Sequence, residues 1–292
     1  MVEKKSSTIW IHVMFTLISI FCVAPFFIIL SASLSTETVI KTNGYSFIPQ
    51  GFTFAAYKYI FASPKAILRP YGVTIFCTVV GTVSSLLITT MLGYTLARKD
   101  FKPRRVLSFM VFFAMLFNVG LVATYYTFVN FYHLKDTIWA MIIPSILSPW
   151  NVFLIKSFMN ENPYELIEAA KIDGSGEIRL FFQIIIPIAK PALATVGLFI
   201  AFAYWNDWYH CFLYINHDSL TSLQYYLYRI MSEASFMASN TMANQMLTGQ
   251  NAIPTVTVRM AMCVLAAGPM LVVFPFFQKY FVKGLTVGSV KG

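Results

Sequence analysis

Several stretches of this sequence are apolar enough and long enough to cross a lipid bilayer as helices. A hydrocarbon core of about 30 Å requires roughly 20 predominantly apolar residues in a helix. Residues 9–30 meet this length without an Asp, Glu, Lys or Arg side chain. Six stretches are long and apolar enough, and they cover approximately residues 9–30, 71–97, 106–128, 137–158, 188–212 and 257–280. We therefore expect an all-α polytopic membrane protein with six transmembrane helices.

Composition supports the same class. Charged residues make up 11% of the chain and hydrophobic residues 58%, whereas ordinary soluble domains carry about 25% charged residues. A cleaved signal peptide is the alternative for the first stretch, but its apolar core is typically about 7–15 residues long. We expect residues 9–30 to remain as the first span of a single transmembrane domain that covers residues 1–292.

Basic residues are distributed unevenly along the chain. Placing both termini in the cytoplasm assigns 14 of the 21 Lys and Arg residues to the cytoplasmic side. Membrane proteins show this excess of basic residues in their cytoplasmic loops. The segment from Arg98 to Arg105 contributes most to it. The net charge of +9 does not indicate a nucleic-acid partner, because the basic residues lie at the ends of apolar stretches and form no single patch.

The loop of residues 162–187 is the longest polar interval on the predicted cytoplasmic side. Helix-forming residues run up to Ile172, and the residues 173–176 (Asp-Gly-Ser-Gly) follow. Glycine adopts the left-handed conformation that ends a helix. A second helical run, residues 177–186, leads to Pro187 and the next apolar stretch. A short helix, a tight turn and another short helix at the membrane surface indicate a docking element for a soluble partner.

The residue types in this loop suit docking. Ala169 and Ala170 are small and favour helix, so a partner surface can approach the backbone closely. Glu168 can pair with a cation of the partner, and Gly174 allows a sharp reversal of the chain. The alternative is an amphipathic helix lying on the bilayer. The acidic residues of the loop oppose that alternative, because helices on lipid surfaces are typically rich in Lys and Arg.

The loop resembles the EAA loop in permease subunits of bacterial ABC importers. That pattern is Glu-Ala-Ala, three residues, Gly, nine residues and Ile-x-Leu-Pro. Here it reads Glu168-Ala169-Ala170, Gly174 and Ile184-x-Ile186-Pro187, with Ile186 in place of leucine. The resemblance implies a cytoplasmic coupling helix within residues 162–187. The residues that it implies for docking on an ATPase are Glu168, Ala169, Ala170, Asp173 and Gly174.

Most of the chain resembles one branch of this family, the second permease of maltose-type carbohydrate importers. The features concerned are the predicted spans, the long interval 214–256 and the ending 281–292. The resemblance implies half of a translocation pathway in the bacterial cytoplasmic (inner) membrane, surrounded by lipid. The implied partners are a homologous second permease, two ABC ATPase subunits and an extracytoplasmic solute-binding protein. The implied substrate is an oligosaccharide, and the 214–256 interval with the Lys-Gly ending resembles the branch that includes acidic, uronate-type sugars.

The chain lacks the sequence features of an enzyme. It contains no G-x-x-x-x-G-K-[ST] phosphate loop and no Ser-His-Asp constellation with a nucleophile elbow. Its four Cys and four His residues show no metal-ligand spacing. We therefore expect no catalytic residue, no metal site and no cofactor in this chain, with ATP and Mg²⁺ bound by the ATPase partners.

A second candidate site lies near the outer end of the fifth predicted span. It comprises Tyr204, Trp205, Asn206, Asp207 and Trp208. Asp207 is the only carboxylate inside a predicted span, and such residues usually face a cavity or the bundle interior. Aromatic rings that stack on sugars and donate hydrogen bonds favour a substrate pathway. The alternative is an aromatic belt at the membrane interface, with Asp207 bonded to a neighbouring helix. The Trp-Asn-Asp motif also resembles the fifth-span signature of the sugar-importer branch.

Other functions stay open at this point. One is an ABC permease for a solute other than a sugar. Another is an ion-coupled secondary transporter, which would need several carboxylates or histidines within the spans, whereas the spans hold Asp207 as their only carboxylate and the scattered His12 and His210. A third is a structural membrane anchor, which would not need polar and aromatic residues inside a span.

Overall fold

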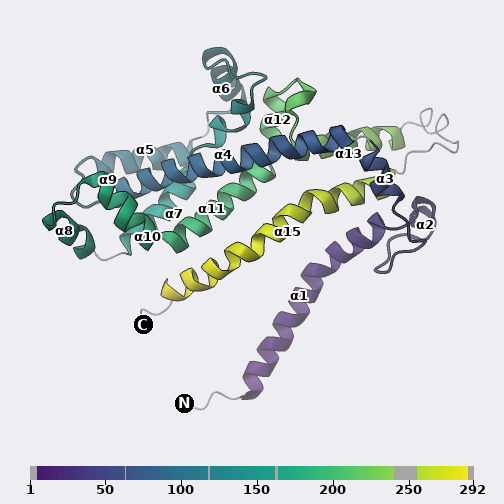
Figure 1. The fold of residues 1–292 in the computed structure, drawn as a ribbon, viewed down its shortest axis with the longest axis horizontal. Coiled ribbons are helices and arrows are strands. Elements are labelled where there is room, and N and C mark those ends of the chain that lie inside the picture. The colour runs from purple at the N-terminus through teal and green to yellow at the C-terminus, as the bar shows by residue number, and fades with distance from the viewer. Residues whose placement is uncertain (1–4, 63, 118, 162–163, 240–254, 289–292) are drawn as a thin grey trace. The chain divides into compact units, whose positions relative to one another are not determined.

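The computed structural model describes residues 5–62, 64–117, 119–161, 164–239 and 255–288, and in these residues it contains helices and no strand (Figure 1). In chain order the elements are α1 (Lys5–Ser33), α2 (Glu37–Asn43), α3 (Ala55–Phe61), α4 (Pro64–Ala97), α5 (Arg104–Leu116), α6 (Leu121–Tyr126), η1 (Thr127–Phe131), η2 (Ile138–Met141), η3 (Ile143–Ser145), α7 (Pro149–Asn160), α8 (Glu165–Ile172), α9 (Glu177–Leu180), η4 (Phe181–Ile185), α10 (Ile186–Ile188), α11 (Lys190–Trp205), α12 (Tyr209–Tyr214), η5 (Asp218–Leu220), α13 (Leu223–Ser239) and α15 (Thr255–Gly288). The expectation of an all-α protein is confirmed.

Three of these helices contain a segment that is long and apolar enough to cross a membrane. The segments are Trp10–Ser33, Pro64–Ala97 and Val256–Phe276. Three bent pairs reach that length only when each pair counts as one span: Arg104–Leu116 with Leu121–Phe131, Ile138–Ser145 with Pro149–Asn160, and Glu177–Ile188 with Lys190–Trp205. The described residues therefore hold between three and six candidate spans, so the count of six stays a prediction.

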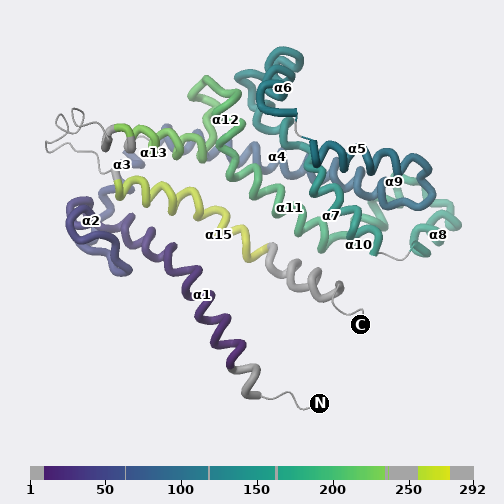
Figure 2. The backbone as a smooth tube through the Cα atoms, turned by 180° about the vertical axis from the view of Figure 1, so that it is seen from behind, coloured from purple at the N-terminus to yellow at the C-terminus, as the bar shows by residue number. Residues whose placement is uncertain are grey.

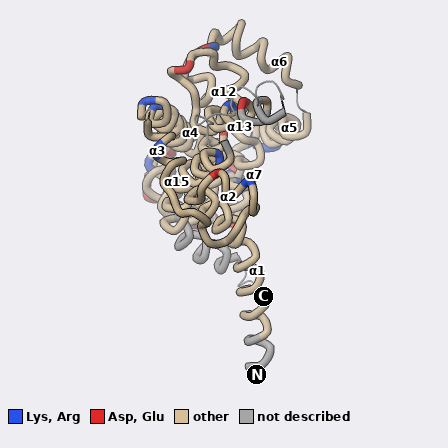
Figure 3. Tube along the Cα trace, turned by 90° about the vertical axis from the view of Figure 1, so that its right-hand side faces the viewer, with Lys and Arg blue, Asp and Glu red and all other residues tan. Residues whose placement is uncertain are grey.

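Exposed apolar surface and sparse charge support a lipid environment. None of the most apolar window of α1 is buried within the chain, and an apolar helix so exposed needs lipid or other helices to cover it. Lys, Arg, Asp and Glu are few along the described helices (Figure 3). Both features agree with the predicted class of membrane protein.

The fourth predicted span, residues 137–158, is interrupted as its prolines suggest. Two short 3-10 helices, η2 and η3, precede α7, and the bend between the two parts is 49°. Pro144 lies in η3 and Pro149 starts α7. Proline has no amide to donate and clashes with the preceding turn, so these two prolines account for the interruption of the span.

Two helix ends differ from the predicted span ends. The fifth span was expected to reach residue 212, but α11 ends at Trp205 and α12 begins at Tyr209. Asp207 lies between the two helices, and its carboxylate accepts the His210 amide in the first turn of α12 at 3.1 Å, which satisfies a helix-start amide that has no acceptor within the helix. The last helix continues past residue 280 to Gly288, because no proline follows Pro275 to end it.

The chain divides into two compact units. One comprises Met1–Ile67 with Leu227–Pro269, and the other Leu68–Tyr226 with Met270–Gly292. Two compact units can belong to one domain, so the single transmembrane domain of residues 1–292 stays a prediction.

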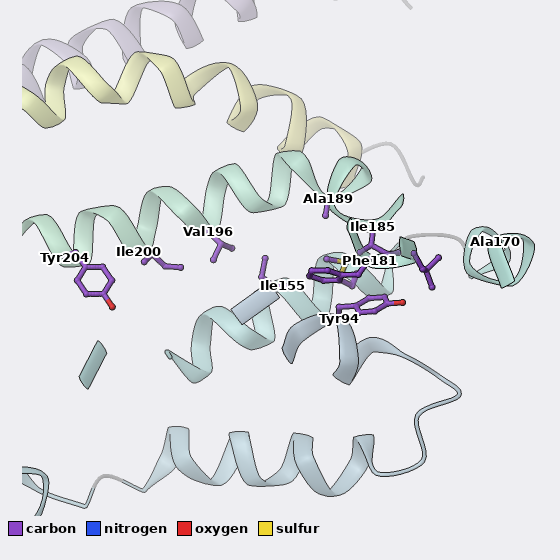
Figure 4. Close-up of a cluster of buried hydrophobic side chains, with 11 residues drawn as sticks. Tyr94, Ile155, Ala170, Phe181, Ile185, Ala189, Val196, Ile200 and Tyr204 are labelled. Atoms are coloured by element: carbon purple, nitrogen blue, oxygen red, sulfur yellow. The ribbon is translucent and has the colours of Figure 1, made fainter. Parts of the chain in front are cut away.

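One buried apolar cluster organises the second unit. Its members are Tyr94, Ile155, Met159, Ala170, Leu180, Phe181, Ile185, Ala189, Val196, Ile200 and Tyr204. Val196, Ile200 and Tyr204 recur every four residues along α11 and form one buried stripe (Figure 4). Tyr204 lies so close to α4 that a Cβ atom at Gly81 would be 2.6 Å from its ring. The Tyr204 hydroxyl donates a hydrogen bond to the Ile142 carbonyl at 2.9 Å. This bond gives a donor to a backbone carbonyl that lies between η2 and η3.

In the first unit, the Glu37 carboxylate on α2 caps the start of α15. It accepts hydrogen bonds from the Val256 amide at 3.2 Å, from the Thr257 amide at 2.9 Å and from the Thr257 hydroxyl at 3.0 Å. The first amides of a helix have no acceptor within the helix. Burial opposes the charge of Glu37, but hydrogen bonds from Thr257, Val256 and Lys41 outweigh it and lower the pKa of this carboxyl below its ordinary 4.5.

Replacing Glu37 with glutamine should destabilise the protein by about 1 kcal/mol, because the charge at the start of α15 is lost. The measurement is the thermal unfolding midpoint of the purified protein in detergent. The pKa of Glu37 is lower in the folded than in the unfolded state. The difference between wild type and variant should therefore be complete above about pH 4.5 and shrink as pH falls through the folded pKa.

The control is Lys41→Gln, which removes only the partly exposed ion pair of 3.1 Å with Glu37. Its effect should stay below about 0.5 kcal/mol, as expected for an exposed pair. Equal destabilisation by the two variants at neutral pH would contradict the capping role.

Candidate functional site

The 162–187 loop contains two short helices joined by a glycine turn. Gly174, between α8 and α9, has φ of +76°. Its amide donates to the Lys171 carbonyl at 3.0 Å, and the Ser175 amide donates to the Ala170 carbonyl at 3.0 Å. This is the Schellman arrangement for ending a helix. The prediction that the first helix ends at Ile172 with a glycine turn after it is confirmed.

The predicted docking residues do not all lie on one face. Glu168, Ala169, Asp173 and Gly174 are exposed. Ala170 is only 6% exposed and belongs to the buried cluster of the unit. Its methyl group therefore packs inside the chain, while the other four residues are accessible to a partner. The docking role of these residues stays a prediction.

Two isoleucines that the sequence analysis did not single out lie exposed on either side of the turn. Ile172 at the end of α8 is 86% exposed, and Ile178 in α9 is 78% exposed. Two residues along a helix correspond to a rotation of about 200°, so Ile172 faces away from the core that Ala170 contacts. The sequence alone held no signal for this, because it does not show which face of the helix meets the core. The exposed side of the turn therefore combines carboxylates with apolar surface.

Four charged side chains tie this turn to the end of α4, and we call Arg98, Asp100, Lys171 and Glu177 the Arg98 cluster. Arg98 donates through Nε to Asp100 Oδ1 at 2.7 Å and through Nη2 to Glu177 Oε1 at 3.0 Å. Lys171 pairs with Asp100, and its Nζ lies 3.8 Å from Glu177 Oε1. The cluster has no net charge.

Pairing keeps the members of the cluster ionised. Hydrogen bonds from Arg98, opposed by burial and assisted by Lys171, hold the pKa of Asp100 well below its usual range. The hydrogen bond from Arg98 also lowers the pKa of Glu177, and the bond to Asp100 raises the pKa of Lys171. All four side chains are therefore charged near neutral pH, and the ion pairs are present there.

The sequence analysis treated residues 98–105 only as cations that favour the cytoplasmic side. One signal for a structural role was present, because Asp100 is the only carboxylate in this basic segment. Its partners were not predictable, because Lys171 lies 71 positions further along the chain. Which carboxylate meets which cation depends on the packing of α4 against the loop.

The second candidate site begins with two buried rings at the end of α11. Tyr204 and Trp205 are each 4% exposed. The Tyr204 hydroxyl is bonded to the Ile142 carbonyl, and the Trp205 ring lies 6.4 Å from the Tyr71 ring. Both side chains pack within the chain in this structure.

The remaining residues of this site differ in exposure. Asn206 and Trp208 are exposed, while the Asp207 side chain is 13% exposed. Asp207 Oδ2 lies 2.9 Å from His210 Nδ1, so the carboxylate serves the start of α12. In the described part of the chain no group of three His, Cys, Asp or Glu side chains could hold a metal ion. A direct role of residues 204–208 in the substrate pathway stays a prediction.

The two candidate sites lie apart in the second unit. The α8–α10 segment lies at one end of α11, and α12 lies at the other end (Figure 1), as the view from behind also shows (Figure 2). The helix between them has 16 residues and is therefore about 24 Å long. A movement at the 162–187 loop can reach residues 204–208 only through packed helices.

Comparison with known families gives a match over most of the chain. The family described as "Binding-protein-dependent transport system inner membrane component" matches residues 89–287. This range contains the Arg98 cluster, the 162–187 loop and residues 204–208.

Individual relatives match almost end to end. "Protein LplC" of Bacillus subtilis (strain 168) is 41% identical over 92% of this chain and 90% of its own. The "Polygalacturonan/rhamnogalacturonan transport system permease protein YtcP" of the same organism is 38% identical over 96% of this chain and 95% of its own. A solved structure, "Crystal structure of a bacterial ABC transporter involved in the import of the acidic polysaccharide alginate", contains a chain that is 27% identical with a TM-score of 0.81. The match covers 96% of this chain and 99% of that chain.

The left-handed conformation of Gly174 leads to a prediction about the stability of the turn that does not depend on function. Gly174→Ala places a side chain in the left-handed region and should cost the turn about 1 kcal/mol, although a Cβ there meets no atom within 4 Å. Amides 171–177 should then exchange hydrogen about fivefold faster, measured by mass spectrometry.

Gly176 is the matched control, because a Cβ there is equally unobstructed and its φ is −69°. Gly176→Ala should leave the exchange rates of this segment unchanged. Equal acceleration in both variants would show that the left-handed conformation of Gly174 is not what stabilises the turn.

Proposed function

The chain belongs to the family of binding-protein-dependent transport system inner membrane components, and from this premise we propose that it forms half of the translocation pathway of an ATP-driven importer. A homologous second permease forms the other half, and two ABC ATPase subunits provide the energy. ATP and Mg²⁺ bind to those subunits. This chain is a transport subunit and not an enzyme.

The observation that carries the coupling role is the exposed, Schellman-capped turn of the 162–187 loop. Glu168, Ala169, Asp173 and Gly174 are accessible there on a segment with defined geometry. A surface that is already ordered loses little conformational entropy on binding. In the proposal this segment is the cytoplasmic coupling helix. An ATPase subunit binds this helix, and the displacement of the helix on ATP binding drives alternating access of the spans.

The proposed orientation has both termini and the 162–187 loop in the cytoplasm. Its support is the distribution of Lys and Arg, of which 14 of 21 lie on that side. The solute-binding protein then delivers cargo from the opposite face of the bacterial inner membrane.

The proposed cargo is an oligosaccharide with acidic sugars. Support comes from the relative named for polygalacturonan and rhamnogalacturonan transport and from the importer of the acidic polysaccharide alginate. Within residues 204–208, exposure favours Asn206 and Trp208 as cargo contacts. A tryptophan ring can stack on a sugar ring, and an amide can bond its hydroxyl groups.

The cargo is tested by uptake into proteoliposomes that contain the permease pair, the ATPases and the solute-binding protein. Radiolabelled trigalacturonate should accumulate in an ATP-dependent manner, and neutral arabinotriose should accumulate at least about tenfold more slowly, as expected when charged groups of a binding site stay unpaired. Faster uptake of the neutral trisaccharide would contradict the acidic-sugar proposal.

The coupling role is tested by Gly174→Arg and Glu168→Arg. Both variants should insert into the membrane normally, because these side chains are exposed. ATP hydrolysis stimulated by the loaded solute-binding protein should fall about tenfold or more, since a wrong charge in a desolvated contact commonly costs above ~2 kcal/mol.

The control for this test is Lys58→Glu, a charge reversal at an exposed residue of α3 outside the loop. It should leave the stimulated hydrolysis unchanged. Wild-type stimulation of ATP hydrolysis in the Gly174→Arg variant would contradict the assignment of this loop as the docking site.

A further inference from the structure

The guanidinium group of Arg98 uses every hydrogen-bond donor that it has. Nε and Nη2 donate to the two oxygens of Asp100, Nη1 and Nη2 donate to the two oxygens of Glu177, and Nη1 also donates to the Tyr94 hydroxyl. An arginine side chain has five N–H donors and no acceptor. The side chain is only 9% exposed, and a buried charge requires this degree of pairing.

The ion pairs of the Arg98 cluster bind the turn on both sides of Gly174. Lys171 belongs to the last turn of α8, and Glu177 is the first residue of α9. Lys171 is bound to Asp100 and Glu177 to Arg98. Two attachments on either side of Gly174 prevent the turn from pivoting about a single point relative to the end of α4.

Apolar packing does little to hold α8 in place. Ala170 is its only buried residue. A cavity of about 80 Å³ lies beside this helix, lined among others by Leu166 and Ile167 of α8, Tyr94 of α4, Arg98 directly after α4, and Ile185. Ile167 adds a partly buried apolar contact with the buried cluster, and the ion pair of Lys171 with Asp100 is a further attachment of α8.

The Arg98 cluster is also connected to the core of the unit. Tyr94, which accepts a hydrogen bond from Arg98 Nη1 at 2.8 Å, has its ring 5.5 Å from the Phe181 ring. Both rings belong to the buried cluster that extends along α11 (Figure 4). A displacement of the turn is thus opposed by charges at α4 and by packed rings behind them.

We propose that Arg98 is a positioning residue that makes the exposed turn of the 162–187 loop and the end of α4 move as one body. The inference rests on the proposed function, in which an ATPase subunit displaces this turn. Arg98 does not touch the ATPase in this proposal. It transfers the displacement to α4 through Glu177 and Asp100.

The experiment follows hydrogen exchange in the assembled importer, with its ATPases, with and without adenylyl imidodiphosphate, an ATP analogue that is not hydrolysed. In wild type, nucleotide should change exchange in both segments 165–180 and 94–105. In Arg98→Gln, segment 165–180 should still respond, while the response of segment 94–105 should be lost. Arg98→Lys should retain part of it, because one ammonium cannot bridge two carboxylates bidentately.

Stimulated ATP hydrolysis is the second readout. Arg98→Gln should bind the ATPases at wild-type stoichiometry but lower hydrolysis stimulated by the loaded solute-binding protein by about fivefold or more, within the usual range of coupling between sites. The matched control is Arg105→Gln, an exposed arginine of the same basic segment. It should change neither the exchange responses nor the stimulation.

The outcomes separate the inference from its premise. A normal response of segment 94–105 in Arg98→Gln overturns the positioning role while leaving the docking site intact. An unresponsive segment 165–180 in wild type overturns the proposed docking and the inference with it. If Arg98→Gln does not assemble, Glu177→Gln replaces it, because this side chain is 62% exposed and its loss should spare folding. A normal response of segment 94–105 in Glu177→Gln would likewise overturn the inference.

Discussion

A peptide group inside hydrocarbon has no water to bond with, so each interruption of a helix needs a partner from the chain itself. Three of the candidate spans are bent pairs of helices, and helices also end at other points of the chain. Side chains bond the backbone at two of these other helix ends. The Tyr204 hydroxyl bonds the Ile142 carbonyl between η2 and η3. The Asp207 carboxylate bonds the His210 amide where α11 gives way to α12. Residues that looked suited to a substrate therefore also maintain the backbone at these breaks.

Charged side chains that are partly or fully buried in this chain also need partners from the chain itself. Glu37 pairs with the start of α15, and Arg98 pairs with Asp100 and Glu177. In both cases at least one partner comes from a segment distant in sequence, so the polar group links two helices. The Arg98 side chain is only 9% exposed, and its ion pairs hold one geometry because any slip leaves this buried charge without a partner. For a transport subunit, such a link joins an exposed turn to a span without a large apolar interface.

Much of the candidate site followed from local rules. The spacing of Glu168-Ala169-Ala170 and Gly174 predicted a helix, its end and a left-handed glycine, because these depend on neighbours within one or two turns. The inward direction of Ala170 was missed, since a helix of eight residues with small and apolar residues on several faces does not reveal which face meets the core. The role of Arg98 was missed because its partner Glu177 lies 79 positions away.

The sequence by itself determined that this chain is helical, that it belongs in a membrane, where its apolar stretches lie and to which family of transport subunits it belongs. Hydropathy, proline and glycine positions and motif spacing are local properties, so they are readable in one dimension. The tertiary structure alone decided that the Tyr204 hydroxyl bonds a backbone carbonyl and that both sides of the Gly174 turn are bound next to the end of α4. Those outcomes depend on which distant segments come within hydrogen-bonding distance, and only the packed chain brings them there.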